Sequence, residues 1–417
     1  MAKKTWLRRT IGLLATAALS LGVAGCGALN STTAPHHQAA STSSKAPILI
    51  GGTLSLTGAF ADPSAQYKMV DEYWANQINK HGGLLGRPVK LIILNDESNP
   101  STSASEYETL INQDHVNLLL APYTTYVGSP DVPIILSHHM LMFNAGFVGE
   151  QLFDQAKGWM VSFYTYQDIQ YTQNFFKWMH SLPASKRPKT IAVLTDQNPF
   201  TIADLQGYDG QGGLLRYAKQ YGFKIVLNEQ YPAGTTNFDS LIEQAKLKGA
   251  QALVALTLPN SGFLIAKTVY QLHYHPMVEF FGGSEVTTLP NWSSLGAAAN
   301  GTMSTTVAAP NQHFNGLAQI VALFKAHGVK VLPSYAASAY AALQVIQQAV
   351  TATHSLNQEV LYKYVHSHTF NTAVGRIHFA PNGTLPNTSL VLQYLHGTNV
   401  VVWPKQYATG SAVVPMP

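Results

Sequence analysis

The sequence predicts an α/β protein of two lobes, each built on a parallel sheet covered by helices. From Pro47 onward, short apolar runs alternate with amphipathic stretches of helical period, and the pattern restarts near residue 169. Strands that are apolar along their whole length are typical of parallel sheets buried on both faces. The chain has 417 residues, whereas single cores stop growing at about 250–300 residues, which favours two lobes.

The first part of the chain carries four apolar runs. The stretch between the first and second runs places aromatic and aliphatic side chains on one face of a predicted helix. This helix is expected to end at Gly82–Gly83. Ser103 and Glu106 predict a capping box for a helix that runs through Asn112. A further short helix is expected between the third and fourth strands. The predicted strands are residues 48–54, 89–94, 116–121 and 141–143.

The second part repeats the alternation. A group of four glycines, Gly207, Gly210, Gly212 and Gly213, does not follow a strand as a dinucleotide-binding loop would, and we interpret it as helix packing. Several strands are expected after Val374. The predicted helices are residues 169–179, 204–221, 239–248, 262–272 and 335–351, and the predicted strands are 190–195, 224–227, 252–257 and 278–281.

The N-terminus has the features of an export signal. Basic residues precede a short apolar run that ends in Val23-Ala24-Gly25-Cys26, so residues 1–25 are predicted to be a signal peptide. The tetrad Val23–Cys26 resembles a bacterial lipobox, which makes Cys26 the predicted lipidation site. The alternative is a plain signal peptide with an incidental cysteine. Cys26 is the one cysteine of the chain, so no intrachain disulfide can form. Residues 26–46 are small and polar and predict a flexible tether.

Charge excludes a nucleic-acid partner. The chain has 25 basic and 21 acidic residues, and the excess of four lies in the predicted signal peptide, at Lys3, Lys4, Arg8 and Arg9. The remainder is formally neutral and has no basic stripe. Charged residues make up 11% of the chain, against about 25% in ordinary soluble domains. Adaptation to an acidic exterior and compositional bias of the lineage both fit this low charge.

Motifs of enzyme chemistry are missing from the sequence. It contains no G-x-S-x-G elbow, no G-K-[ST] phosphate loop and no H-E-x-x-H metal frame. The paired histidines have no carboxylates at zinc-ligand spacing, so ordinary polar roles are favoured. We therefore expect no catalytic residue, no metal site and no cofactor. The pairs are His138–His139, His273 with His275, and His366 with His368.

An ordered set of motifs resembles a known family. Leu54–Gly58 gives an S-x-x-G pattern after the first strand, and Ile78–Val89 gives I-N-x-x-G-G-x-x-G after the first helix. Asn95–Pro100 forms a D-x-x-x-P turn, and Tyr340–Gln344 matches a late Y-A-A-L-x helix. In order and spacing these resemble the branched-chain amino-acid-type (Leu/Ile/Val-binding-like) periplasmic solute-binding proteins of ABC transporters.

The resemblance implies two Rossmann-like lobes joined by three crossover strands, the type I periplasmic binding protein fold. It implies lobe 1 at residues 47–165 plus 306–376 and lobe 2 at 166–305 plus 377–417. A small-molecule ligand would lie in the cleft between the lobes, and the partner would be an ABC permease in the membrane. The implied protein is a monomer outside the cytoplasm, held to the membrane by its lipid anchor alone.

Loops at the carboxyl ends of strands face the cleft in such a fold, which selects candidate ligand-binding residues. Thr124 and Thr125 could form a carboxylate cradle with amides of a following helix, or could be a turn that satisfies its own backbone. Amino-acid binders of the family place a glutamate at Glu285 for the ligand ammonium group; a solvated loop glutamate is the alternative. The other candidates are Thr57, Phe60, Ala145, Gly146, Phe147, Phe200 and Leu258.

The ligand class stays open because the sequence departs from the amino-acid-binding pattern. Phe147 stands where a threonine is frequent, Pro63 where a tyrosine is frequent, and Leu258 where an aromatic residue is frequent. Together with Phe60 and Phe200, these predict a more apolar pocket. A small aromatic acid, an amide or a urea-like solute is the alternative to an amino acid, and a ligand sensor without a transport role is the alternative to an importer component.

Overall fold

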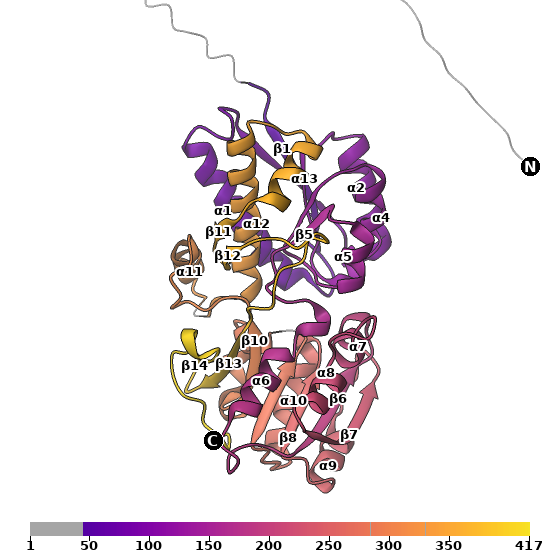
Figure 1. Cartoon of the computed structure of the whole chain (residues 1–417), viewed down its shortest axis with the longest axis vertical. Coiled ribbons are helices and arrows are strands. Elements are labelled where there is room, and N and C mark those ends of the chain that lie inside the picture. Colours follow the sequence, from indigo (N-terminus) through magenta and orange to yellow (C-terminus); the bar gives the residue numbers. More distant parts are fainter. Residues whose placement is uncertain (1–44, 284, 330) are drawn as a thin grey trace, which may run out of the picture. The chain divides into compact units, whose positions relative to one another are not determined.

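The computed structural model describes residues 45–283, 285–329 and 331–417 (Figure 1). The predicted signal peptide, the predicted lipidation site Cys26 and the predicted tether up to residue 44 lie outside the described residues. The α/β prediction is confirmed: two large sheets each collect strands separated by helices.

The first lobe is built on a five-stranded sheet in which all strands are parallel. Its strands are mostly apolar, and alternate residues enter two different cores. The strand order is β2-β1-β3-β4-β5. The bounds are β1 (Ile48–Leu54), β2 (Val89–Asn95), β3 (Leu118–Leu120), β4 (Met142–Asn144) and β5 (Met160–Ser162).

Helices cover both faces of this sheet. One core joins the sheet to α1 and α12, which pack against each other (Figure 1). The other core joins it to α2, α4 and α5. The bounds are α1 (Ala61–Lys80), α2 (Pro100–Asn112), α3 (Thr125–Gly128), α4 (Asp131–Ser137), α5 (Glu150–Ala156), α11 (Leu317–Ala326), α12 (Ser334–Thr353) and α13 (Gln358–Ser367).

The second lobe is built on a seven-stranded sheet of order β14-β13-β10-β9-β8-β6-β7. Strands β6 to β10 run parallel, whereas β13 and β14 are antiparallel to their neighbours. His396 and Gly397 connect these two strands with positive φ, which suits a tight hairpin. The bounds are β6 (Thr190–Asp196), β7 (Lys224–Tyr231), β8 (Ala252–Leu256), β9 (Val278–Gly282), β10 (Met303–Thr306), β13 (Leu390–Leu395) and β14 (Thr398–Trp403).

Short helices flank this second sheet and follow its strands. The α-helices are α6 (Gln173–Ser181), α7 (Pro199–Gln206), α8 (Leu214–Gln220), α9 (Asp239–Leu247) and α10 (Pro259–Gln271). The 3₁₀ turns are η1 (Asp168–Gln170), η2 (Val286–Thr288), η3 (Trp292–Ala299) and η4 (Lys405–Tyr407). Within the described part of the chain, no helix combines the length and the apolarity needed to cross a membrane.

The chain passes between the two sheets three times. It leaves the first sheet after β5, returns from β10 to α11 and α12, and comes back to the second sheet at β13. A small hairpin, β11 (Phe370–Thr372) and β12 (Gly375–Ile377), packs on α12 before the last passage. Helix α12 thus belongs to the first lobe although five strands of the second lobe, β6 to β10, precede it.

Two local predictions are wrong. The capping box at Ser103 and Glu106 does not start a helix: α2 begins earlier, where the Asn99 side chain accepts hydrogen bonds from the amides of Ser101 and Thr102. The Ser103 hydroxyl is buried instead and donates to Asp131 at 2.8 Å.

The predicted helix 204–221 is two helices, α7 and α8, separated by a loop. All four of its glycines have positive φ and lie at or between the helix ends, and at all of them but Gly210 little room is left for a side chain. At Gly207 a Cβ atom would also lie 2.2 Å from the carbonyl oxygen of Gln211. Strand β5 was not predicted, because three residues are too few to show a period.

Several carboxyl groups are buried in these lobes without a cationic partner. Among the described residues the ion pairs are Lys68–Glu72 and His138–Glu108, neither of which involves a buried carboxyl. Burial raises the pKa of Asp71, on α1, and of Asp131, on α4, to about 8. It does the same to Glu279, on the central strand β9. At neutral pH these groups hold protons that they lose on unfolding.

We therefore expect the protein to be more stable at pH 5 than at pH 8. A carboxyl whose pKa is about 4 in the unfolded chain and about 8 in the folded protein imposes no penalty below pH 4, and stability is lost as the pH rises towards 8. Thermal unfolding followed at a series of pH values measures this. Asp131→Asn should flatten the profile, and Glu229→Gln, at an exposed position, should leave it unchanged. A melting temperature that rises from pH 5 to pH 8 would contradict the expectation.

Candidate functional site

Glu285 lies at the junction of the two lobes. It follows β9 and precedes η2, has φ of 50°, and is 5% exposed. Its Oε1 accepts hydrogen bonds from the hydroxyl of Tyr166 and, at 2.8 Å, from Ser334 Oγ. Its amide donates to the hydroxyl of Tyr171 at 3.0 Å. Ser334 begins α12 of the first lobe, and Tyr166 lies on the first passage of the chain between the lobes. Glu285 of the second lobe is therefore hydrogen-bonded by both of these segments.

No cationic side chain among the described residues pairs with this enclosed carboxyl. Burial raises the pKa of Glu285 to about 7, and the hydrogen bonds from Tyr166 and Ser334 oppose that rise. Both of those bonds go to Oε1, so within the described residues Oε2 has no protein donor. The solvated-loop alternative is wrong for this residue, because the side chain is enclosed.

Six tyrosines surround Glu285, and we call them the tyrosine cluster: Tyr67, Tyr123, Tyr164, Tyr166, Tyr171 and Tyr335. Adjacent rings have centroids 4.9–6.1 Å apart. The Tyr67 and Tyr164 hydroxyls, 3.1 Å apart, link the two halves of the cluster. Burial raises the pKa of every one of them, and Glu285 raises it further. The cluster is therefore a set of neutral hydroxyls and aromatic faces.

Two predicted residues extend the cluster at its ends. Phe60, at the start of α1, packs edge-on to Tyr123 with centroids 6.0 Å apart. Phe200, in α7, packs edge-on to Tyr171 at the same separation. Both phenylalanines are half-buried, one from each lobe. The structure thus brings Phe60, Phe200 and Glu285 to one aromatic site.

One hydroxyl of the predicted carboxylate cradle, that of Thr125, is paired within the chain. Thr125 Oγ1 donates to the carbonyl of Val148 at 2.6 Å, and the Thr124 amide donates to the carbonyl of Gly146 at 2.9 Å. The amides of Gly146 and Phe147 both donate to Asn144 Oδ1 at 3.0 Å. Among the described residues, the Thr124 hydroxyl and the amides of Thr125 and Tyr126 at the start of α3 make no hydrogen bond, so both readings of the threonine pair stay open.

Ala145 and Phe147 take part through packing and through the backbone. The Ala145 carbonyl accepts a hydrogen bond from Tyr67 at 2.7 Å, which ties this loop to the tyrosine cluster. The Phe147 ring is 2% exposed and enters the hydrophobic core of the first lobe, against Gly128. This loop therefore presents its backbone and not an aromatic face, contrary to the apolar pocket expected from Phe147.

Thr57 and Leu258 lie away from these contacts. Thr57 is exposed and its hydroxyl accepts a hydrogen bond from Asn95 at 3.1 Å. Leu258 is half-buried at the start of α10. Neither is joined to Glu285 by a hydrogen bond within the described chain.

Sequence reasoning missed most of the tyrosine cluster. Tyr164, Tyr166 and Tyr171 lie in or just after the first passage between lobes, and Tyr335 lies beside Ser334 at the start of α12. The sequence predicts ligand-binding residues on the loops that follow strands, whereas these tyrosines lie on the segments that connect the two lobes. The closely spaced Tyr164 and Tyr166 within the predicted crossing were the one available signal.

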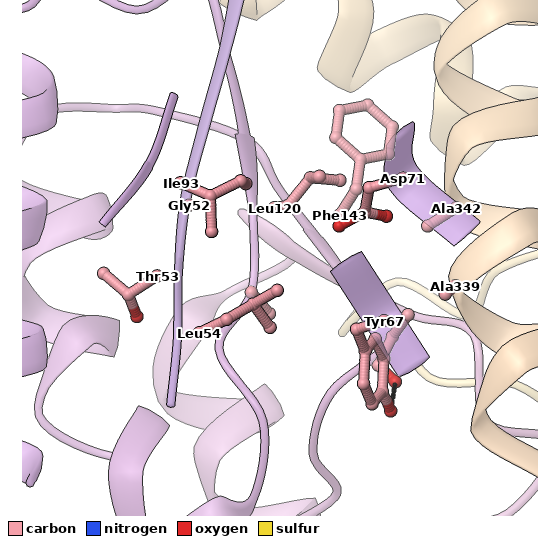
Figure 2. Close-up of a pocket in the computed structure, with 12 residues that line it drawn as sticks. Gly52, Thr53, Leu54, Tyr67, Asp71, Ile93, Leu120, Phe143, Ala339 and Ala342 are labelled. Atoms are coloured by element: carbon pink, nitrogen blue, oxygen red, sulfur yellow. Dashed lines mark hydrogen bonds between the residues drawn. The ribbon is translucent and has the colours of Figure 1, made fainter. Parts of the chain in front are cut away.

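A small cavity lies next to the cluster inside the first lobe. It has a volume of about 10 Å³, room for roughly one water molecule, and lies between the sheet and helices α1 and α12. Figure 2 shows Tyr67 and Asp71, one helical turn apart on α1, on the side of the helix that lines it. No cluster of metal-ligating side chains occurs among the described residues.

Gly146 offers a test of whether its loop is fixed by packing. A Cβ atom at this position would lie 1.7 Å from the carbonyl oxygen of Pro122, which is backbone and cannot yield easily. We expect Gly146→Ala to lower the free energy of unfolding by at least about 2 kcal/mol, measured by urea titration of the ligand-free protein. Gly410→Ala, whose Cβ would meet only the end of the Val400 side chain, is the milder control. Equal stability of the two variants would contradict the packing role.

Comparison with known proteins agrees with this architecture. The family model described as "Periplasmic binding protein" matches residues 47–398. A leucine-, isoleucine-, valine-, threonine- and alanine-binding protein of Pseudomonas aeruginosa is 25% identical over 364 residues, covering 82% of this chain and 89% of the relative.

Solved structures show the same fold at lower identity. A leucine-binding protein of Thermotoga maritima has a TM-score of 0.72 at 16% identity, covering 85% of this chain and 97% of the other. A solute-binding protein of an ABC transporter from Rhodopseudomonas palustris, in complex with 3,4-dihydroxybenzoic acid, has a TM-score of 0.74 at 16% identity, covering 88% and 98%. The chain belongs to the periplasmic binding proteins of the branched-chain amino-acid type, which bind solutes and are not enzymes.

Proposed function

We propose that this protein captures a small organic solute with a positively charged amino or ammonium group and delivers it to the permease of an ABC importer. The observation that carries the proposal is the buried Glu285 carboxyl, which among the described residues has no donor to Oε2 and no cationic partner. A buried charge without a partner is unfavourable, so a ligand cation would supply what the protein leaves out.

Ligand capture would couple to the arrangement of the lobes. Glu285 comes from the second lobe, whereas Ser334, Tyr67 and Tyr335 come from the first. A ligand that contacts these residues of both lobes would favour the closed arrangement, in which the residues meet. Its free energy of binding would be that of binding to the closed arrangement, less the free energy needed to close the lobes. The domain bounds 47–165 plus 306–376 and 166–305 plus 377–417 remain part of this proposal.

Location follows the same reasoning. Relatives named as amino-acid-binding proteins belong to a periplasmic family, and the predicted signal peptide agrees with export. We propose that lipid on Cys26 holds the protein at the outer face of the membrane, where a permease can receive the solute. A monomer and a transport role also remain proposals.

A second candidate is a protein of the same fold that senses a small aromatic acid. It is favoured by the tyrosine cluster and by the fold shared with a protein solved with 3,4-dihydroxybenzoic acid. A ligand-dependent complex with a permease would support the importer, and one with a signalling protein would support the sensor.

Thermal-shift measurements test the amino-group assignment. The panel holds amino acids, amines, short amides, urea and aromatic acids at neutral pH. A ligand at 100 times its dissociation constant stabilises by about 2.7 kcal/mol, which is several degrees. We expect the stabilising ligands to carry an amino or ammonium group and to lose their effect in Glu285→Gln.

Glu279→Gln is the matched control, because Glu279 is equally enclosed on β9 but is not among the contacts of the tyrosine cluster. It should keep the ligand response. A response confined to aromatic acids or amides, or one that survives in Glu285→Gln, would contradict the proposed function.

A further inference from the structure

We propose that Asp96 is a positioning residue that fixes residues 55–60, the loop between β1 and α1, and that Asp131 assists it by holding the one proton that these two buried carboxyls share. This inference goes beyond the proposed function and needs it only for the statement that the loop faces the ligand. The loop carries the candidate residues Thr57 and Phe60, and Phe60 packs on the tyrosine cluster.

The loop is attached to the turn that follows β2. Ser98 Oγ donates to the carbonyl of Thr57 at 3.0 Å and accepts from the amide of Phe60 at 3.1 Å, so one hydroxyl holds both candidate residues. A Cβ atom at Gly58, between them, would lie 2.6 Å from the same oxygen. The position of Ser98 therefore determines the course of the loop.

Asp96 holds Ser98 in a strained backbone conformation. Glu97 and Ser98 have φ of 56° and 59°, in the left-handed region that residues other than glycine rarely adopt. Such conformations persist where the surrounding structure enforces them, often beside ligands. Asp96 Oδ1 accepts from the Ser98 amide at 2.8 Å and from Ser55 Oγ at 2.5 Å, so it joins the turn to the first residue of the loop. Hydrogen bonds to an ionised carboxylate are roughly twice as strong as those to a neutral acceptor.

A second buried carboxyl, that of Asp131 on α4, belongs to the same network. Its Oδ2 lies 2.8 Å from Ser103 Oγ, which lies 3.1 Å from Thr53 Oγ1. The Thr53 hydroxyl in turn lowers the pKa of Asp96, and both carboxyls raise the pKa of Tyr107, which stays neutral. Among the described residues, no lysine, arginine or histidine acts on the pKa of these three groups. Two ionised carboxyls without a cation are unfavourable here, so one proton is expected on the pair.

The number of donors assigns this proton to Asp131. Within the described chain Asp131 has one donor, the Ser103 hydroxyl, whereas Asp96 has the Ser55 hydroxyl and the Ser98 amide. Burial raises the pKa of both carboxyls. The nearby Asp96 raises that of Asp131 further, to about 8, while the hydrogen bonds from Ser55 and Ser98 lower that of Asp96. Asp131 is therefore neutral at pH 7 and Asp96 is ionised.

A proton on Asp131 also directs the hydroxyl groups towards Asp96. If Asp131 were ionised, Ser103 would donate to it, and Thr53 would have to donate to Ser103, because each hydroxyl has one hydrogen. With the proton on Asp131 Oδ2, the same contact runs in the opposite direction. Ser103 then donates to Thr53, and the Thr53 hydroxyl becomes a third donor for the Asp96 carboxylate.

Hydrogen exchange of the ligand-free protein at pH 7, followed by mass spectrometry, tests the unequal roles of the two carboxyls. Asp96→Asn keeps the size of the side chain but removes its charge, and we expect residues 55–60 to exchange about tenfold faster or more. Asp131→Asn is the matched control: it replaces a carboxyl that is already neutral and should leave this segment unchanged. No acceleration in Asp96→Asn, or equal acceleration in both variants, would overturn the proposal.

Ser98→Ala keeps the test decisive if Asp96→Asn fails to fold. It leaves both carboxyls in place and removes the hydroxyl that joins Thr57 to Phe60. Residues 55–60 should again exchange faster, while the strand Ala252–Leu256 of the second lobe serves as the internal reference. Unchanged exchange of residues 55–60 in this variant would contradict the positioning role.

Infrared difference spectroscopy locates the proton, because a protonated carboxyl has a C=O stretching band that a carboxylate lacks. At pH 7 Asp131→Asn should lose one such band. Asp96→Asn should retain it, since burial, the larger cause, still raises the pKa of Asp131. Retention of the band in Asp131→Asn, or its loss in Asp96→Asn, would overturn the proton assignment. None of these measurements uses a ligand, so their failure leaves the proposed function intact, and failure of the thermal-shift test leaves this inference standing.

Discussion

The Glu285 carboxyl joins parts of the chain that are far apart in sequence. It follows the fourth consecutive parallel strand of the second sheet along the chain, yet its hydrogen-bond donors are Tyr166 on the first passage between lobes and Ser334 at the start of α12. Because the carboxyl is enclosed and pairs with no cation of the described chain, these two hydroxyls oppose part of its desolvation. The order of the tyrosine cluster depends on the same contacts, since Tyr166 and Tyr171 both touch Glu285 and Tyr335 adjoins Ser334.

The sequence predicted the sheets far better than it predicted the site. Continuous apolar runs such as Ala252–Leu256 are too short for a buried helix and follow a glycine, which favours a strand. Helix α1 shows its buried face as Tyr67, Val70 and Trp74. Glu285, Phe60 and Phe200 were also predicted, because they follow strands at the edge where ligands bind in this fold. Tyr335 could not be found in that way, since its position depends on how α12 packs on α1.

Other differences have local causes. Ser103 looked like a helix cap because serine and glutamate were spaced correctly, but Asn99 is a better cap and stands beside Pro100, which suits the first helical position. Of the threonine pair 124–125, predicted as ligand donors, Thr125 donates its hydroxyl to the loop. Spacing alone cannot say whether a hydroxyl is already paired. The low charge of the chain, by contrast, has a counterpart inside the fold, where carboxyls such as Asp131 and Glu279 are enclosed in the neutral form.

The three passages between the sheets also determine when the protein can fold. Strand β10 lies between β9 and β13, and its register joins Met303 to Gln393, ninety residues later. Helix α12 packs on α1, more than 250 residues before it. Neither lobe has all its parts until almost the whole polypeptide has been synthesised, and contacts between such distant segments form slowly. Losing β13 and β14 would deprive the second sheet of the strands on the far side of β10.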